Sequence, residues 1–127
     1  MPINVPKLIQ YWKQGAEEDI DTAQLLFKNR KRREALFWAH LALEKALKAS
    51  VVKAIAASAP YSHDLPYLAK CAKLELSEDR RKFLGRMNQF VAWGRYPDQV
   101  NPLPSLEKTR QNIQEAEELI QWLIQRL

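Results

Sequence analysis

Apolar residues recur every three or four positions along most of this chain, and this spacing constrains the possible fold more than any other feature. In the segment from about Pro6 to Lys28 they are Leu8, Trp12, Ala16, Ile20, Ala23 and Phe27. Such spacing places all of them on one face of an α-helix. The chain has only three glycines, which is too few for the turns of a sheet-rich fold. The sequence therefore predicts an all-α protein.

Polar and proline-containing breaks divide the chain into five expected helices. The first covers about residues 6–28 and can be capped by Asn4, and Ser62 or Asp64 caps a short third helix. The second covers about residues 34–57, and its apolar stripe consists of Leu36, Leu43, Leu47, Val51 and Ala54. Ser77 caps a fourth helix that ends near Gly94, and a fifth begins around residues 102–104 and runs to the end. Long helices joined by short connectors pack antiparallel. We expect one domain over residues 1–127, an up-and-down bundle of four to five helices.

Composition excludes several classes of protein and site. No stretch approaches the roughly 20 apolar residues of a membrane span, and no secretory leader is visible, so we expect a cytoplasmic protein. The single cysteine, Cys71, is expected to be a small core residue. Two histidines without metal-ligand spacing argue against a zinc site, and no glycine-rich phosphate loop occurs. We expect no cofactor.

Basic residues are unevenly spread in a chain whose formal net charge is +5. One cluster lies within residues 28–33 and another within residues 80–86. Such clusters attract polyanions, of which a phosphate backbone is the commonest in a cell. The clusters are equally compatible with no binding role, the first as a solvated loop and the second as a solvated helix face.

The second predicted helix carries charges inside its apolar arc. On a helical wheel His40 lies on the core-facing stripe, with Glu44 about 40° and Lys48 about 80° away. Because an exposed pair of this spacing contributes only about 0.3–0.5 kcal/mol, we expect at least one of the two charges to meet another helix or a partner chain. Asp19, at the edge of the first helix's apolar face, is the candidate within the chain. The network either sets helix register or faces a ligand or dimer partner.

His63 stands beside Asp64 at the expected start of the third helix. A histidine in this position can be a pH-responsive donor or acceptor for a phosphate or a neighbouring carboxylate. It can equally be a residue of the capping region that Asp64 holds in place. The residues alone leave both interpretations open.

Four segments together resemble a known family. They are "AEEDIDTAQLL" in the first helix, "ALFWAHLALEKALKA" in the second, "SHDLPYLAK" at the third helix start, and the loop "GRYPD". Their order and intervals resemble the HEPN (higher eukaryote and prokaryote nucleotide-binding) domain from about Trp12 to Leu123. The resemblance implies a bundle of four to five helices, a homodimer, and a minimal nucleotidyltransferase as partner in a toxin–antitoxin pair.

Many HEPN domains resemble metal-independent ribonucleases built on an Arg-x(4–6)-His motif, and this sequence departs from that motif. No histidine follows His63, so no later arginine has a downstream partner. Arg33 and His40 have six residues between them, but they lie in the wrong helix and His40 is expected to face the core. If the protein is an enzyme, His63 and Arg95 are the candidate catalytic residues.

The residues that match the family define a candidate polar groove. The resemblance implies phosphate binding by Lys48 and Arg95, with Tyr96 stacking on a base or accepting a nucleotidyl group. His63 and Asp98 are further candidates for binding the ligand or its phosphate, and Pro97 also matches the family. Glu44, Lys45 and Asp64 match as well and, with Asp19, are expected to form a polar network.

Three functions follow as alternatives. The first is a nucleotide- or RNA-phosphate-binding component of a two-gene system, which requires Lys48, His63 and Arg95 to converge. The second is a metal-independent ribonuclease toxin. The third is a non-catalytic helical dimer in which "GRYPD" only shapes a turn.

Overall fold

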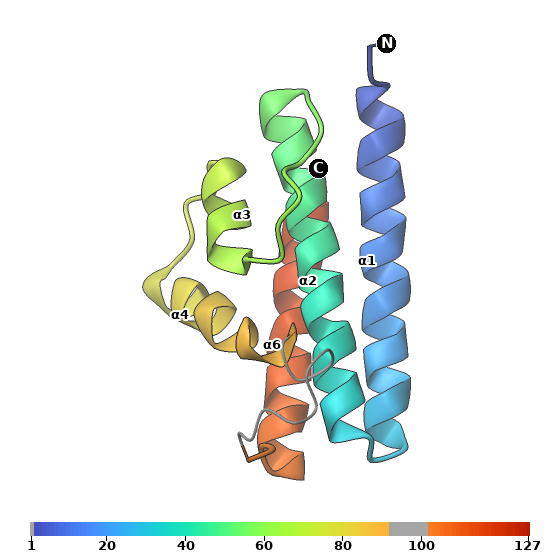
Figure 1. The fold of residues 1–127 in the computed structure, drawn as a ribbon, viewed down its shortest axis with the longest axis vertical. Helices are drawn as coiled ribbons and strands as arrows, with labels where there is room; N and C mark the ends of the chain where they lie inside the picture. Colours follow the sequence, from blue (N-terminus) through green and yellow to red (C-terminus); the bar gives the residue numbers. More distant parts are fainter. Residues whose placement is uncertain (1, 92–101) are drawn as a thin grey trace.

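A computed structural model describes residues 2–91 and 102–127, and the regular secondary structure in those ranges is entirely helical (Figure 1). The helices are α1 (Val5–Lys28), α2 (Arg32–Ile55), α3 (Leu65–Cys71), α4 (Glu78–Met87) and α6 (Leu106–Gln125). The predicted all-α class and helical bundle are confirmed. None of the described helices is both long and apolar enough to cross a membrane.

The cap residues expected from the sequence begin three of these helices. The side chains of Asp64 and Ser77 accept hydrogen bonds from the backbone N–H groups of Tyr67 and Arg80, and Asn4 does the same for Lys7. Each cap satisfies an N–H that has no partner inside the helix. Local side-chain chemistry therefore sets where these helices start.

α1 and α2 form an antiparallel hairpin with a tight connection. Arg30 adopts a left-handed backbone conformation, with φ 61°, and the Lys31 N–H bonds the carbonyl of Leu26. The basic segment 28–33 thus reverses the chain at one end of the bundle. The long side-by-side contact of the two helices brings the middle of α1 against the middle of α2 (Figure 1).

α2 is the central helix and is buried on nearly all sides. Fourteen of its residues are buried, and five of these are alanines, small enough to let neighbouring helices approach closely. Ala54, expected on the core stripe, is instead exposed. It lies in the last turn of α2, beside Lys53, whose ammonium group donates to the Arg126 carbonyl just past the end of α6. The neighbouring helix therefore ends where Ala54 would need cover.

α6 runs parallel to α2, because α3 and α4 carry the chain back to the end of the bundle where α2 begins (Figure 1). The Arg32 guanidinium, at the start of α2, donates to the Pro104 carbonyl just before α6 at 2.6 Å. α3 and α4 project to one side of the long helices. Cys71, expected in the core, is half-buried, because it lies at the last position of the short helix α3, where the chain leaves the bundle surface.

α4 ends earlier than the sequence indicated. It stops at Met87, and residues 89–91 resume helical backbone after Asn88. The apolar residues that the spacing places on its inner face are Phe83, Leu84, Met87, Phe90 and Val91. The first four are buried, and Val91 is half-buried. The expected end at Gly94, and the segment "WGRYPDQV" around it, lie outside the described residues.

Candidate functional site

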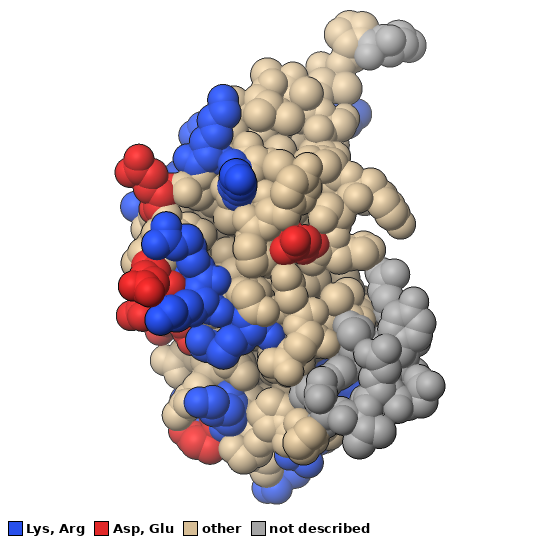
Figure 2. Space-filling model, turned by 60° about the vertical axis from the view of Figure 1, so that its left-hand side comes forward, with Lys and Arg blue, Asp and Glu red and all other residues tan. Residues whose placement is uncertain are grey.

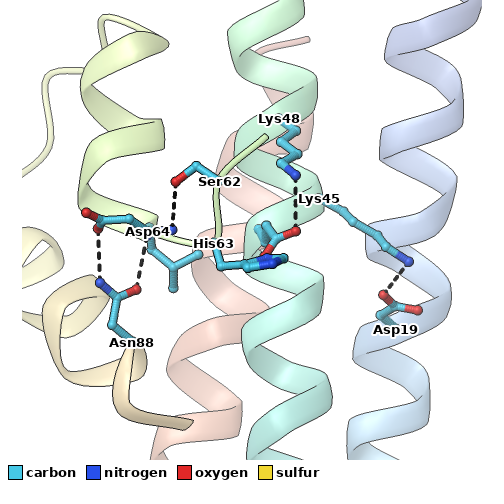
Figure 3. A network of polar contacts seen from close by, with 9 residues as sticks. Asp19, Lys45, Lys48, Ser62, His63, Asp64 and Asn88 are labelled. Carbon is cyan, nitrogen blue, oxygen red and sulfur yellow. Dashed lines mark hydrogen bonds and ion pairs between the residues drawn. The ribbon is translucent and has the colours of Figure 1, made fainter. Parts of the chain in front are cut away.

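The buried carboxylate of Glu44 on α2 joins Lys48 to His63, whose side chains are shown in Figure 3. One oxygen of Glu44 is 3.2 Å from the Lys48 ammonium nitrogen, and the other is 2.7 Å from Nδ1 of His63. The side chains of Glu44 and Lys48 are each only 7% exposed, whereas His63 is 32% exposed. We call these three residues the Glu44 cluster. Its buried pair is covered and its imidazole reaches the surface.

The loop between α2 and α3 holds His63 in place through a second set of hydrogen bonds. The Asp64 N–H donates to the Ser62 hydroxyl at 3.1 Å. The Asn88 side chain accepts from the Leu65 N–H and donates to the Asp64 carboxylate, both at 3.0 Å (Figure 3). The residue just past α4 therefore ties down the start of α3, which fixes the backbone on which His63 stands.

Aromatic rings flank the Lys48 ammonium group. It lies 5.2 Å from the ring centre of Trp12 on α1 and 5.9 Å from that of Tyr61. Both distances are within the range of cation–π attraction. The Tyr61 ring also meets the His63 ring edge-on at 5.8 Å and is 94% exposed. An imidazole and an exposed aromatic ring thus lie at the surface, next to a buried cation.

The geometry fixes the tautomer of His63. A carboxylate only accepts hydrogen bonds, so Nδ1 must carry the proton that points to Glu44. In the neutral ring Nε2 is then the acceptor, and in the protonated ring it is a donor. Because Glu44 already compensates the charge of Lys48, protonation of His63 would give the cluster a net positive charge. This arrangement can accept a proton or bind an anion.

His40 lies one turn before Glu44 and is completely buried. Its ring nitrogens make no hydrogen bond of good geometry among the described residues, although the Asn88 side chain and the His63 backbone lie near them. Burial lowers the pKa of His40 below its ordinary value, while the Glu44 carboxylate, the Asn88 side chain and the His63 backbone oppose that change. The predicted core-facing position is confirmed. A substrate cannot reach this ring, so the Arg33–His40 spacing does not make a catalytic pair.

Asp19 pairs with Lys45 and not with Glu44 or Lys48, which corrects the expected partner. The Lys45 ammonium nitrogen is 2.7 Å from the Asp19 carboxylate (Figure 3). Successive helix residues are rotated by about 100°, so Lys45 faces α1 where Glu44 faces the α2–α3 loop. Gly15 makes room for this lysine, since a Cβ there would lie 2.9 Å from Lys45 Cδ. This pair joins α1 to α2, apart from the Glu44 cluster.

The HEPN domain model matches residues 9–127 of the chain. The chain belongs to the HEPN family. Among solved structures, the HEPN fold of this chain is similar to TT1696 from Thermus thermophilus, with 20% identity, a TM-score of 0.80, and coverage of 94% of this chain and 98% of that one. It is also similar to ST0689, an archaeal HEPN homologue, with 17% identity, a TM-score of 0.73, and coverage of 93% and 96%. No curated protein sequence matches.

In this HEPN domain the structure unites only part of the predicted site. Glu44, Lys48 and His63 converge, and Asp64 supports them from the α3 cap. Lys45 joins the separate pair with Asp19. Arg95, Tyr96, Pro97 and Asp98 lie outside the described residues, so their predicted roles stay predictions. The described residues contain no group of three potential metal ligands.

Sequence reasoning missed three residues of the HEPN site. The apolar spacing predicts Trp12 only as a core residue, and Tyr61 has no predicted role although it lies two positions before His63. Nothing in the sequence pointed to Asn88, whose partners are 23 and 24 residues away.

Proposed function

We propose that this HEPN protein binds the phosphate of a nucleotide or RNA, as the binding component of a toxin–antitoxin-like pair with a minimal nucleotidyltransferase. One observation carries the proposal. Lys48 and His63, predicted from separate segments to share a site, lie on the same Glu44 carboxylate, next to an exposed aromatic ring. Family membership supports the nucleotide and the partner enzyme, and the protein is proposed to act as a homodimer.

The cluster suggests how a phosphate would be held. His63, the exposed member, would donate from Nε2 when it is protonated, and Lys48 would contribute charge from behind. Tyr61 would stack on a base, since every base has a π-face and such stacking depends little on which base is present. Arg95 and Tyr96 retain the phosphate and base roles that the resemblance implies for them.

A nucleotide panel monitored by thermal shift tests this proposal. A ligand present at 100 times its dissociation constant raises the free energy of unfolding by about 2.7 kcal/mol. We expect His63→Gln to lose this stabilisation while keeping the unliganded melting temperature near that of wild type. Lys70→Met, which removes an exposed charge on α3, is the matched control and should respond like wild type. No response to any nucleotide or short RNA would favour the non-catalytic dimer scaffold instead.

The partner enzyme requires a separate measurement. We expect a nucleotidyltransferase gene beside this one, and the two purified proteins to form a complex on size-exclusion chromatography. A neighbouring gene of another class, together with independent elution, would leave nucleotide binding intact but remove the two-gene part of the proposal.

The contact between His63 and Glu44 favours a second candidate, a metal-independent ribonuclease. A carboxylate 2.7 Å from Nδ1 orients an imidazole so that Nε2 can take a proton from a 2′-hydroxyl. Arg95 would then neutralise the charge that develops on the phosphate. RNA incubated with the protein and EDTA should be cleaved, and His63→Ala should abolish cleavage. Cleavage that persists in His63→Ala would exclude this role for His63.

A further inference from the structure

A hollow of about 310 Å³ lies between α3 and α4, away from the Glu44 cluster. Its buried residues are Ala69, Leu76 and Leu84, and half-buried Leu74 adds to its apolar surface. None of these residues belongs to the candidate site described above. The hollow is therefore a separate feature of the flank that α3 and α4 form.

The end of α3 shapes this hollow. Lys73 adopts a left-handed conformation, with φ 57°, and the Leu74 N–H reaches back to the Ala69 carbonyl at 3.2 Å. This helix-ending turn directs the connector back along α3, so Leu74 and Leu76 line the same hollow as Ala69. The apolar surface is thus held by backbone hydrogen bonds.

The flank that α3 and α4 form carries more basic than acidic residues. Residues 65–87 contain six Lys or Arg against three Asp or Glu. Figure 2, which turns this side of the molecule forward, shows Lys and Arg gathered in a band with a few acidic side chains near them. Several of these cations are already engaged. Lys82 pairs with Glu78 at 3.4 Å, Arg86 lies 3.6 Å from Glu115, and the Arg80 guanidinium stacks over Trp122 at 4.7 Å.

The two cations that line the hollow itself differ from these. Lys70 and Arg81 both line it, and neither forms an ion pair with another residue in the described ranges. An apolar hollow with unpaired charge at its edge combines a hydrophobic anchor point with a polar rim, the usual anatomy of a protein-binding surface.

We propose that the hollow between α3 and α4 binds an acidic peptide segment of a partner protein, with one apolar side chain inserted between Ala69, Leu76 and Leu84. Carboxylates on either side of that anchor pair with Lys70 and Arg81. Charge complementarity selects an acidic partner. The apolar lining favours a polypeptide over RNA, because a phosphate backbone has no aliphatic group to fill it, and the acidic residues of the flank oppose a continuous phosphate track.

A selection from random peptides displayed on phage, with the full-length protein as bait, tests this. We expect enriched peptides to share a Leu, Ile or Phe flanked by Asp or Glu. A synthetic peptide of the enriched sequence should bind wild type with an affinity that falls as salt rises. Arg81→Glu should weaken it about tenfold or more by replacing attraction with repulsion, and Ala69→Met should weaken it by filling the hollow.

Lys82→Glu is the matched control, a charge reversal on the same helix at a lysine that does not line the hollow. It should change the affinity much less than Arg81→Glu, and circular dichroism should show all three variants folded. The proposal is overturned if the enriched peptides lack acidic residues or bind Arg81→Glu as well as wild type. A short RNA that binds in place of peptides and needs Arg81 would overturn it by assigning the flank to nucleic acid. A dimer that Ala69→Met dissociates would overturn it by assigning the flank to a second copy of the chain.

Discussion

The pair of charges buried on α2 allows a quantitative test of how the site is held together. Glu44→Gln keeps the shape of the side chain and its capacity to accept hydrogen bonds, but it removes the charge that compensates Lys48. Both side chains are 7% exposed, and their charged atoms are 3.2 Å apart. Removing one member of a buried pair costs about 3–5 kcal/mol, because the remaining charge is left without compensation. We expect the lower end of this range, because Gln still accepts hydrogen bonds.

A double variant separates the buried charge from the packing. Glu44→Gln with Lys48→Met removes both charges and replaces the lysine by an apolar side chain of similar length. Because no uncompensated charge is then left buried, the double variant should recover to within about 1 kcal/mol of wild type. As a control, Lys82→Met breaks the Lys82–Glu78 pair, whose side chains are 67% and 72% exposed, and should cost at most about 1 kcal/mol.

Urea unfolding at neutral pH, followed by circular dichroism, gives the three free energies. For a domain of this size a loss of 3 kcal/mol lowers the melting temperature by about 10–15 °C, which thermal scans would register independently. Two results would refute the reasoning. One is a loss below about 1 kcal/mol for Glu44→Gln, and the other is a double variant whose losses simply add.

Two further predictions concern groups that contact the cluster. Burial lowers the pKa of His40 from its ordinary 6.5. As the pH falls below that value, the unfolded state binds a proton first, and the free energy of unfolding decreases until the folded state is protonated too. His40→Leu should therefore reduce the loss in free energy of unfolding between pH 7 and pH 5, and an unchanged loss in urea titrations would contradict this. Asn88→Ala removes two hydrogen bonds at the start of α3 and should lower the free energy of unfolding by about 1–3 kcal/mol. NMR should show faster amide exchange at Leu65. Exchange at Leu65 equal to wild type would show that Asn88 does not hold this helix start.

The helices of this protein were predictable because the interactions that define them are local. Spacings of three and four residues place Leu8 through Phe27 on one face, and Asn4, Asp64 and Ser77 cap backbone groups only a few residues away. The contacts of Asn88 were not predictable, because its hydrogen bonds reach Asp64 and Leu65 at the start of another helix. The parallel course of α6 depends likewise on α3 and α4, whose direction no local pattern encodes.

The candidate site divides along the same line. Sequence alone determined the helical fold, the anomalous charges inside the apolar arc of α2, and the HEPN resemblance that the family match confirms. Only the tertiary structure decided which residue each charged group contacts. Glu44 contacts His63, which is 19 residues away in the sequence, and Asp19 pairs with Lys45. The physical reason is that helical periodicity fixes the face on which a side chain lies, whereas its contacts depend on where the other helices pass. A 100° step from Glu44 to Lys45 was enough to send two neighbouring charges to different partners.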